Sequence, residues 1–243
     1  MPRIIHGFHL TRKRKHRITT GLILFVILII ILTISVSAGS SIGQLLSALS
    51  ISLFRLVVAY IISLIIAAII AVLVSDNKIG DSLIPVFDLM QNLPSFALIP
   101  IFVLWLGYTN LMTIIFATTS ILWPILFYML HALKTVNKDE EDAAKIFGAR
   151  GLKKILFFSL PVAFPSAVTG SIVGFSIGWE AIIGVEIIGL SSGIGPFLNA
   201  SSGIGNYNKT LILGISALLL VVFLINRLVW MPLLKKSQLY AEQ

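Results

Sequence analysis

The chain has 243 residues, of which 57% are hydrophobic and 12% are charged, with a net charge of +8. Soluble globular domains carry roughly twice this share of charged residues, so the composition excludes that class and indicates an integral membrane protein. The chain contains no cysteine, which excludes disulfides, thiolate metal sites and thiol catalysis.

Six apolar stretches are each about long enough to cross a ~30 Å hydrocarbon core as a helix. They cover residues 21–38, 56–74, 83–106, 111–130, 162–188 and 211–234. The alternating pattern of a membrane β-barrel is absent, so the backbone must satisfy its hydrogen bonds within helices. We therefore expect an all-α integral membrane protein in which residues 21–236 form six transmembrane helices between a basic tail (1–20) and a short tail (237–243).

Positive charge gathers in the N-terminal tail, in the loop at 134–161 and after the last apolar stretch. With six spans these places fall on one side of the membrane, whereas Arg55 and Lys209 fall on the other. The positive-inside rule then places both termini and the loop in the cytoplasm of a multi-pass cell-membrane protein. Membrane orientation accounts for the net charge better than binding to nucleic acid does.

The first apolar stretch also has features of a cleavable signal peptide. Basic residues precede it, and the small residues Val36, Ser37 and Ala38 follow its core. Cleavage would leave the new N-terminus outside the cell, against the charge pattern. We therefore expect residues 21–38 to remain as a span.

The connection into the second apolar stretch and the stretch itself have different patterns. Residues 39–55 mix apolar residues with Ser, Gly and Gln, which is typical of a short external connection with an interfacial helix. Within the second stretch, small residues every four positions predict one face that packs closely on a neighbouring helix. These residues are Ala59, Ser63, Ala67 and Ala71.

The third stretch contains three prolines, Pro85, Pro94 and Pro100. Proline removes an amide donor and clashes with the preceding turn, so we expect a kinked or broken helix. Asp88, Gln91 and Asn92 form a polar cluster beside the break, where a solute pathway could run. An equally open alternative is that Asp88 and Gln91 lie at the interface and pair with a neighbouring helix.

The fourth stretch has a short run of consecutive polar residues, Thr118, Thr119 and Ser120. Hydroxyl groups within a helix often donate to the carbonyl one turn earlier, which is the favoured interpretation here. The alternative is that these hydroxyls face a pore. Thr118 and Thr119 are therefore kept as candidate pathway residues.

The fifth stretch has small residues at four-residue intervals, namely Ser166, Gly170, Gly174 and Gly178. This face predicts tight helix contact. Trp179, Glu180 and Glu186 follow directly, and carboxylates in a span are costly and commonly functional. They are candidate pathway residues, and the alternative is a buried pair with a basic residue.

Residues 189–209 contain the sequence GIG twice within a Gly-, Ser- and Asn-rich segment. Neither copy precedes Lys-Ser or Lys-Thr, and the G-x-x-x-x-G-K-[ST] motif is absent from the chain. A nucleotide cradle is therefore unsupported, and we expect an external loop with turns and a re-entrant piece.

The polar segment from Asn137 to Pro161 interrupts the apolar pattern. Asn137 can cap a helix, Glu141 and Lys145 can form an i,i+4 pair, and Gly148 suits a left-handed helix end. A second helix over 149–159 would follow at an angle and make an elbow on the cytoplasmic side. The physics alone also fits a merely solvated connection between spans.

The order of residues in this segment resembles the EAA loop of ABC importer permeases. The matching positions are Asp142, Ala143, Ala144, Gly148, Phe158, Ser159, Leu160 and Pro161. The sequences LPSFALIP (93–100), LWLG (104–107) and SGIG (192–195) are similar to those of the nitrate, sulfonate and taurine permease branch. The likeness covers about residues 45–235.

The resemblance implies a homodimeric permease that binds two cytoplasmic ABC ATPase subunits and an extracytoplasmic solute-binding protein. ATP and magnesium would bind to the ATPase, and this chain would hold no cofactor. The coupling residues would be Glu141, Asp142, Ala143, Ala144, Gly148, Leu160 and Pro161. Permeases that carry anions often have a basic residue near the position of Gln91, and this chain has none there. A neutral or cationic solute, such as a pyrimidine precursor of thiamine, therefore stays open beside sulfonate, taurine and nitrate.

Two rival hypotheses would give Glu180 and Glu186 a chemical role. An intramembrane enzyme would need a nucleophile, base or metal within reach of these carboxylates. An ion-coupled secondary carrier would use them as proton sites and would favour internal inverted repeats. A transport subunit without catalysis of its own is the leading prediction.

Overall fold

The computed structural model describes residues 42–75, 78–200 and 207–241. The expected N-terminal tail and first span, with the signal-peptide alternative, lie outside these residues. The side chain of Lys209, one of the two charges expected on the external side, also lies outside the described part of the chain. Within the described ranges every regular element is helical. The main helices are α2 (Ile42–Ser75), α3 (Lys78–Gln91), α4 (Ile99–Leu106), α5 (Asn110–Lys134), α6 (Lys138–Ile146), α7 (Leu152–Lys154), α8 (Leu160–Gly189), α9 (Ile194–Ala200), α10 (Tyr207–Ile225) and α11 (Met231–Ala241).

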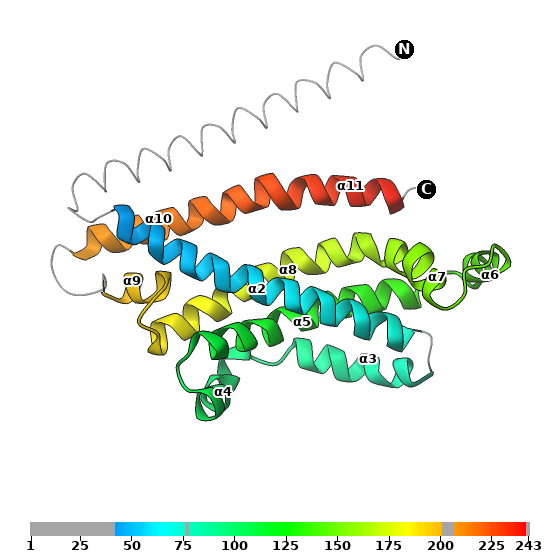
Figure 1. Ribbon diagram of the computed structural model, residues 1–243, viewed down its shortest axis with the longest axis horizontal. Coiled ribbons are helices and arrows are strands. Elements are labelled where there is room, and N and C mark those ends of the chain that lie inside the picture. Colours follow the sequence, from blue (N-terminus) through cyan, green and yellow to red (C-terminus); the bar gives the residue numbers. More distant parts are fainter. Residues whose placement is uncertain (1–41, 76–77, 201–206, 242–243) are drawn as a thin grey trace, which may run out of the picture.

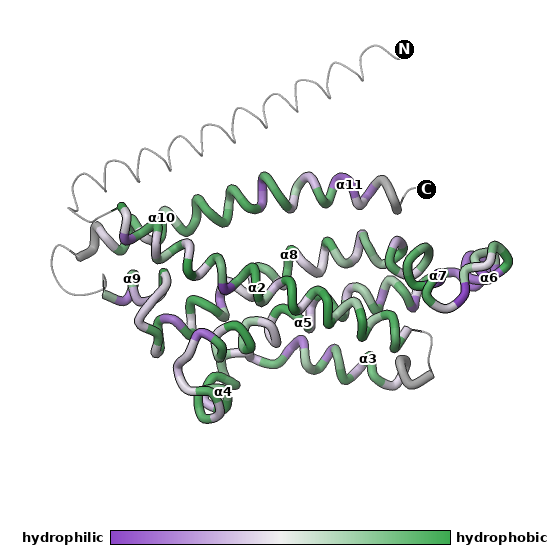
Figure 2. The backbone as a smooth tube through the Cα atoms, in the orientation of Figure 1, coloured by the Kyte–Doolittle hydropathy of each residue, from purple (hydrophilic) through white to green (hydrophobic). Residues whose placement is uncertain are grey.

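Four of the described helical runs are apolar and long enough to cross a membrane. They are Ile42–Ser75, Asn110–Lys134, Leu152–Gly189 and Thr210–Gln238. A bent pair of helices in the third stretch makes a fifth if it is counted as one span. Figure 2 shows that the green, hydrophobic backbone dominates these runs and that purple gathers around α6. The all-α membrane fold is confirmed, and the count of six spans stays a prediction.

The helices α5 and α8 form the centre of the bundle, and α2 crosses them (Figure 1). A Cβ atom added to Gly170 would lie 3.0 Å from the Cα atom of Ile125, and one on Gly174 would lie 3.0 Å from the carbonyl oxygen of Ile121. Since almost no side chain fits there, these glycines allow the close helix approach that their spacing predicts. The small residues of α2 are buried in the same way.

The third stretch is broken, as its prolines predict. The helical pieces Ser82–Gln91 and Ser95–Leu106 meet at 88°. Pro94 comes directly before a 3-10 turn (Ser95–Leu98), and Pro100 lies in the first turn of α4. Because neither proline can donate an amide hydrogen bond to the preceding turn, the chain changes direction here.

The expectation of a short external connection with its own interfacial helix is wrong. Among residues 42–55, the described part of that segment, there is no separate helix, because α2 runs without interruption from Ile42 to Ser75. Its polar residues Ser52 and Arg55 are buried inside the bundle, where they form hydrogen bonds.

The second helix expected over 149–159 is the beginning of the fifth span. A π-helical turn (Ile155–Ser159) joins α7 to α8, so one helical run extends from Leu152 to Gly189. Pro161 therefore lies within this run and does not start it. A π-turn widens the helix next to Pro161, whose missing amide leaves a carbonyl one turn earlier without its usual donor.

Candidate coupling surface and polar core

The elbow (residues 137–154) projects from one end of the bundle, at the right of Figure 1. The side chain of Asn137 caps α6 by accepting a hydrogen bond from the amide of Asp139 at 3.2 Å. The helix ends at Ile146, and Gly148 follows with φ of +84°. The expected cap and left-handed helix end are confirmed.

One ion pair connects α6 to the helical run that follows it, and two others lie within α6. The Nζ atom of Lys154 donates to Oε1 of Glu141 at 2.9 Å, and Lys145 lies 3.2 Å from the same oxygen. Lys145 also donates to Asp142 at 3.0 Å. The expected i,i+4 pair of Glu141 and Lys145 is confirmed, and Lys154 joins α6 to the helical run of α8.

The same contacts shift the pKa values of Glu141 and Lys145. The hydrogen bond from Lys154, followed by that from Lys145, holds the pKa of Glu141 below its ordinary value. Hydrogen bonds to Asp142 and then to Glu141 raise the pKa of Lys145. Both groups are thus charged at neutral pH, and the elbow keeps its ion pairs.

Large apolar side chains protrude from this charged elbow. Ile146 is 83% exposed and Phe147 is 90% exposed. A hollow of about 350 Å³ lies beside them, and Ala144, Phe147, Gly148, Ala149, Lys153, Phe157 and Phe158 line it. Exposed apolar groups of this kind are typical of surfaces that contact another protein or a membrane.

The structure brings together only part of the predicted coupling set. Asp142 and Ala143 are exposed on α6, next to Glu141 and the hollow that Ala144 lines. Leu160 and Pro161 lie in the first turn of α8 instead. There they line a different groove of about 330 Å³, together with Leu156, Phe164 and Lys236.

The break between α3 and α4 surrounds a small cavity of about 90 Å³ with α5. Its lining is largely aromatic and apolar, and it includes Thr119, Ser120, Phe102, Phe116, Trp123, Met90, Leu93, Ser95 and Leu98. Just after α3, the side-chain amide of Asn92 donates to the backbone carbonyl of Asp88 at 2.8 Å. The side-chain oxygen of Gln91 is buried and accepts no hydrogen bond from the described residues.

The hydroxyl groups of α5 bond within their own helix. Thr118 donates to the carbonyl of Ile114 at 2.7 Å, and Thr119 donates to that of Ile115 at 2.9 Å. The favoured interpretation of back-bonding is confirmed. Thr119 still borders the cavity at the break, whereas Thr118 does not line it.

The three candidates at the end of the fifth stretch lie in different surroundings. Trp179 is buried in the apolar core, and its indole nitrogen has no hydrogen-bond partner among the described residues. Glu180 is exposed. Glu186 is fully buried, and its Oε1 atom lies 2.5 Å from Nη1 of Arg55. The alternative of a buried pair with a basic residue is therefore correct for Glu186.

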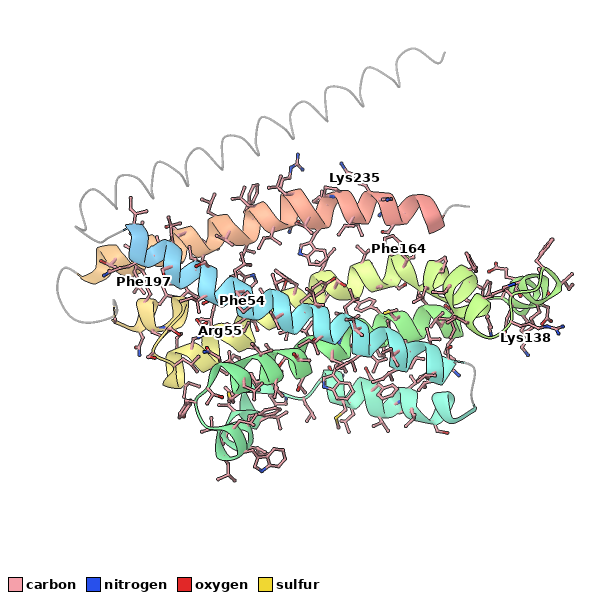
Figure 3. All side chains as sticks on the ribbon, in the orientation of Figure 1. Phe54, Arg55, Lys138, Phe164, Phe197 and Lys235 are labelled. Carbon is pink, nitrogen blue, oxygen red and sulfur yellow. The ribbon has the colours of Figure 1, made fainter. Side chains whose placement is uncertain are left out.

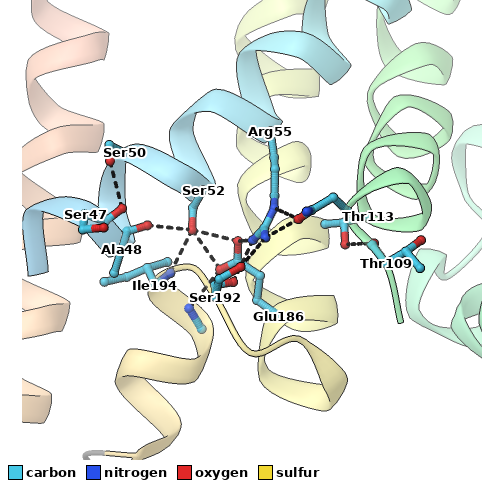
Figure 4. A network of polar contacts seen from close by, with 12 residues as sticks. Ser47, Ala48, Ser50, Ser52, Arg55, Thr109, Thr113, Glu186, Ser192 and Ile194 are labelled. Carbon is cyan, nitrogen blue, oxygen red and sulfur yellow. Dashed lines mark hydrogen bonds and ion pairs between the residues drawn. The ribbon is translucent and has the colours of Figure 1, made fainter. Parts of the chain in front are cut away.

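Five residues form what we call the polar core: Ser52, Arg55, Asn110, Glu186 and Ser192. Figure 4 shows four of them, Ser52, Arg55, Glu186 and Ser192. The hydroxyl of Ser52 lies 2.8 Å from both carboxylate oxygens of Glu186, and the amide of Gly195 donates to Oε2 at 2.9 Å. Arg55 also donates to Asn110 on α5 and to Ser192 after α8. The network therefore holds α2, α5, α8 and the loop before α9 together.

Sequence reasoning missed Arg55, Ser52, Asn110 and Ser192 as a group. Arg55 counted only as one of two charges on the external side. Ser52 and Arg55 are three residues apart, so they share a helix face, which was the available signal. Their partner Glu186 follows 131 residues after Arg55, and no local pattern reveals such a pairing.

The first GIG sequence, which begins at Gly193, lies directly against the side chain of Glu186. Gly193 has φ of +116°, and a Cβ atom there would lie 2.3 Å from the carboxyl carbon of Glu186. A Cβ atom on Gly195 would lie 2.4 Å from the Cβ atom of Glu186. Both glycines thus allow the backbone to approach a buried anion of the chain itself. The segment then forms the short helix α9.

Comparison with known proteins identifies the family to which this sequence is similar. Residues 59–229 match the family described as the binding-protein-dependent transport system inner membrane component. The chain is 28% identical over 142 residues to the taurine transport system permease protein TauC of Escherichia coli (strain K12), which covers 58% of this chain and 51% of that protein. It is 28% identical over 136 residues to the formylaminopyrimidine transport permease protein ThiX of Halalkalibacterium halodurans (55% and 50% covered). It is 26% identical over 148 residues to the nitrate import permease protein NrtB of Leptolyngbya laminosa (61% and 53% covered).

These relatives confirm the resemblance to the nitrate, sulfonate and taurine branch of permeases. The aligned segments cover about half the length of each of these three relatives. The family consists of inner-membrane transport components, so the prediction of a transport subunit rather than an enzyme is also confirmed. The matched segment extends from α2 to the last described span and includes most of the chain. The chain therefore belongs to the family of binding-protein-dependent transport system inner membrane components.

Proposed function

We propose that this chain is the membrane subunit of an ATP-driven importer and that cytoplasmic ATPase subunits bind to its elbow. The observation that carries the proposal is the pair of protruding side chains Ile146 and Phe147 on a helix that ion pairs hold in place. A polar helix gains nothing from exposing two large apolar groups to water, whereas a docked partner would cover them. ATP and magnesium would bind to that partner.

We propose that movement passes from the elbow to the broken span through three contacts between helices. The Glu141–Lys154 pair connects α6 to the helical run of α8. Through Gly170 and Gly174, α8 packs against the backbone of α5, which borders the cavity at the broken span. Movement of the elbow would thus reach the pathway residues proposed at the break, Gln91, Asn92 and Thr119, through closely packed helices.

The assembly that we propose contains two copies of the chain and receives solute from an extracytoplasmic binding protein. The likeness to the nitrate, sulfonate and taurine permeases supports this arrangement. The charge pattern supports cytoplasmic termini and a cytoplasmic elbow. The Glu186–Arg55 pair weakens the rival carrier or enzyme at Glu186, because this carboxylate already has a buried structural partner.

The proposed solute is a small neutral or cationic compound rather than an anion. Relatives are named for taurine, nitrate and formylaminopyrimidine. The cavity at the broken span has aromatic walls, hydroxyl groups and no charged residue among its described lining. Aromatic walls suit a planar ring or a cation, and an uncharged lining offers an anion no counter-ion. A pyrimidine precursor therefore fits better than nitrate or a sulfonate.

The test replaces the protruding side chains by Ile146→Ala and Phe147→Ala in one variant. We expect the ATPase to co-purify with the unmodified chain and to be lost from this variant, with uptake reduced about tenfold or more, because truncated interface anchors commonly cost that much. The matched control is Leu219→Ala with Leu228→Ala, two exposed residues of the last span. Retained ATPase and unchanged uptake in the elbow variant would overturn the proposal, and ATP-independent uptake would support a carrier.

A further inference from the structure

The fifth span carries a carboxylate, Glu180, on its exposed surface. The residue lies about 13 Å of helix before the end of α8 at Gly189, within the helical run that is apolar enough to cross a membrane. Unlike Glu186, it forms no hydrogen bond or ion pair with any residue that the structure describes. An unpaired carboxylate at this depth is costly against lipid, so we expect it to face water or a polar partner.

Three further exposed residues share this side of α8, namely Val173, Ser176 and Ile187. Together with Glu180 they are spaced by three, four and seven positions, which places them on one face of the helix. We call these four residues the Glu180 face. Gly174 lies on another side of the helix, against α5. The bundle thus leaves uncovered a transmembrane face that has a hydroxyl group and a carboxylate at its centre.

An aromatic ring borders the Glu180 face. A Cβ atom added to Gly184 would collide with Cε1 of Phe96, so this ring lies directly against α8, one helical turn beyond Glu180. Phe96 belongs to the 3-10 turn of the broken span (Ser95–Leu98) and is 49% exposed. A carboxylate attracts a cation by its charge, and an aromatic ring attracts one by its quadrupole. Both attractions therefore act on the same side of α8.

The cavity at the broken span is too small to hold a solute by itself. Its volume is about 90 Å³, whereas small-molecule sites usually measure roughly 300–1,000 Å³. The rest of a solute site must come from surfaces that one copy leaves open. Ser95 lines the cavity and the neighbouring Phe96 lies against α8, so the same short turn connects the cavity to the Glu180 face.

The described lysines and Arg55 offer Glu180 no counter-ion. Arg55 lies inside the bundle, where it pairs with Glu186. Figure 3 shows Lys138 on the elbow, beyond the end of the bundle, and Lys235 on α11. The remaining described lysines lie in the elbow, at the ends of α3 and α5, or on α11. Arg227 of the last span is then the basic residue left to consider.

Arg227 lies in the π-helical turn Asn226–Trp230. Trp230, at the end of this turn, packs on Phe175 of α8 with ring centroids 5.4 Å apart. Phe175 and Glu180 are five residues apart on one helix, so their side chains point about 140° apart. The last span therefore packs on another side of α8 than the Glu180 face, and the counter-ion of Glu180 has to come from outside the chain.

We propose that Glu180 binds the positively charged nitrogen of a small organic cation and that the ring of Phe96 contacts the same group. This inference rests on the proposed transport function and deepens it, because the solute becomes an ammonium or amidinium compound rather than a neutral one. In an assembly of two copies, two Glu180 faces along one pathway would bring two carboxylates near each other. Their mutual repulsion is relieved when a cation lies between them.

The test uses the absence of cysteine from the chain. Ser176→Cys places one thiol on the Glu180 face of the full chain in membranes. Its labelling rates are measured with a cationic and an anionic methanethiosulfonate reagent of similar size, each divided by the rate with a free thiol in solution. The same pair of rates is then measured with Glu180→Gln added. The control is Leu219→Cys, on an exposed residue of the last span that should face lipid and react slowly with both reagents.

We expect the cationic reagent to label Ser176→Cys about tenfold faster than the anionic one, because a unit negative charge lies one helical turn away. Glu180→Gln should bring this ratio close to one. Benzylamine, a cation with a planar ring, should slow the labelling of Ser176→Cys, whereas the neutral benzyl alcohol should not. If Ser176→Cys disturbs the fold, Val173→Cys on the same face gives the same readouts.

Two results would overturn the inference. Absence of labelling by either reagent would mean that protein or lipid covers the Glu180 face. A ratio that Glu180→Gln leaves unchanged would mean that another group, such as Arg227 of a second copy, already neutralises the carboxylate. Because the labelling requires no ATPase, whereas the importer proposal is tested by co-purification of one, either proposal can fail without the other.

Discussion

The elbow and the polar core are both held by a carboxylate that meets basic side chains, yet they lie in opposite environments. At the elbow, Glu141 and Lys145 are open to water. In the polar core, Arg55 and Glu186 are almost completely buried and their hydrogen-bonding atoms are paired with Ser52, Asn110 and Ser192. The elbow pairs can exchange with water at little cost, whereas the buried pair cannot open without leaving a charge unpaired. The first region is suited to movement and the second to holding helices together.

The largest loss of stability is expected when one partner of the buried Arg55–Glu186 pair is removed. Arg55→Met leaves the Glu186 carboxylate buried without its counter-ion, and we expect the free energy of unfolding to fall by about 3–5 kcal/mol. Denaturant unfolding in detergent measures this change. Lys145→Met at the elbow is the matched control and should cost no more than about 1 kcal/mol.

A double variant sharpens this prediction. Arg55→Met combined with Glu186→Leu removes both charges, so it should recover part of the lost stability. If Arg55→Met alone proves harmless, the interpretation of the polar core as a helix clamp is wrong.

The next effect compares two glycines with positive φ. Gly193→Ala should lower stability by about 1–3 kcal/mol through backbone strain alone, and more because the new Cβ atom would meet the Glu186 carboxylate. Gly148→Ala at the elbow meets no atom within 4 Å and carries only the strain. Thermal unfolding of the two variants side by side measures the difference, and equal losses would contradict the close contact at Gly193.

A smaller effect is expected from the elbow pairs. Glu141→Gln removes contacts to Lys154 and Lys145 that water screens, so stability should fall by only about 0.2–1 kcal/mol. Amide hydrogen exchange of α6 should nevertheless become faster, because the helix loses its link to Lys154. Unchanged exchange would show that Glu141 does not hold α6.

The smallest effect is a pH dependence of the same contacts. The pKa of Glu141 in the folded chain lies below its ordinary value of 4.5, so the unfolded chain takes up the proton first as the pH falls. The stabilisation is complete above pH 4.5 and disappears as the pH falls through the lowered value. The hydrogen-exchange protection of α6, corrected for the intrinsic rate at each pH, should thus fall only in acid, and Glu141→Gln should abolish that step.

Local features of the sequence predicted local structure well. The Asn137 cap, the left-handed Gly148 and the break at Pro94 follow from the conformational preferences of single residues, and each is present. The glycine face of α8 also packs as its spacing predicts, because that spacing depends on helix geometry alone.

Features that depend on distant residues were not predictable in this way. The role of Arg55 depends on Glu186, far along the chain, and the sequence alone placed residues 39–55 outside the bundle. The continuity of the fifth span through Pro161 depends on a π-turn that no residue type specifies. The candidate site was therefore predicted at the elbow and only in part at the polar core.

The unbroken run from Leu152 to Gly189 has a mechanical consequence. At 1.5 Å per residue, its 38 residues make a rod about 57 Å long, and a tilt of about 5° at one end displaces the other by about 5 Å. Lys154 lies near one end of the rod and Glu186 near the other. A push at the elbow would therefore turn this rod about the polar core, because the buried charges there resist sliding.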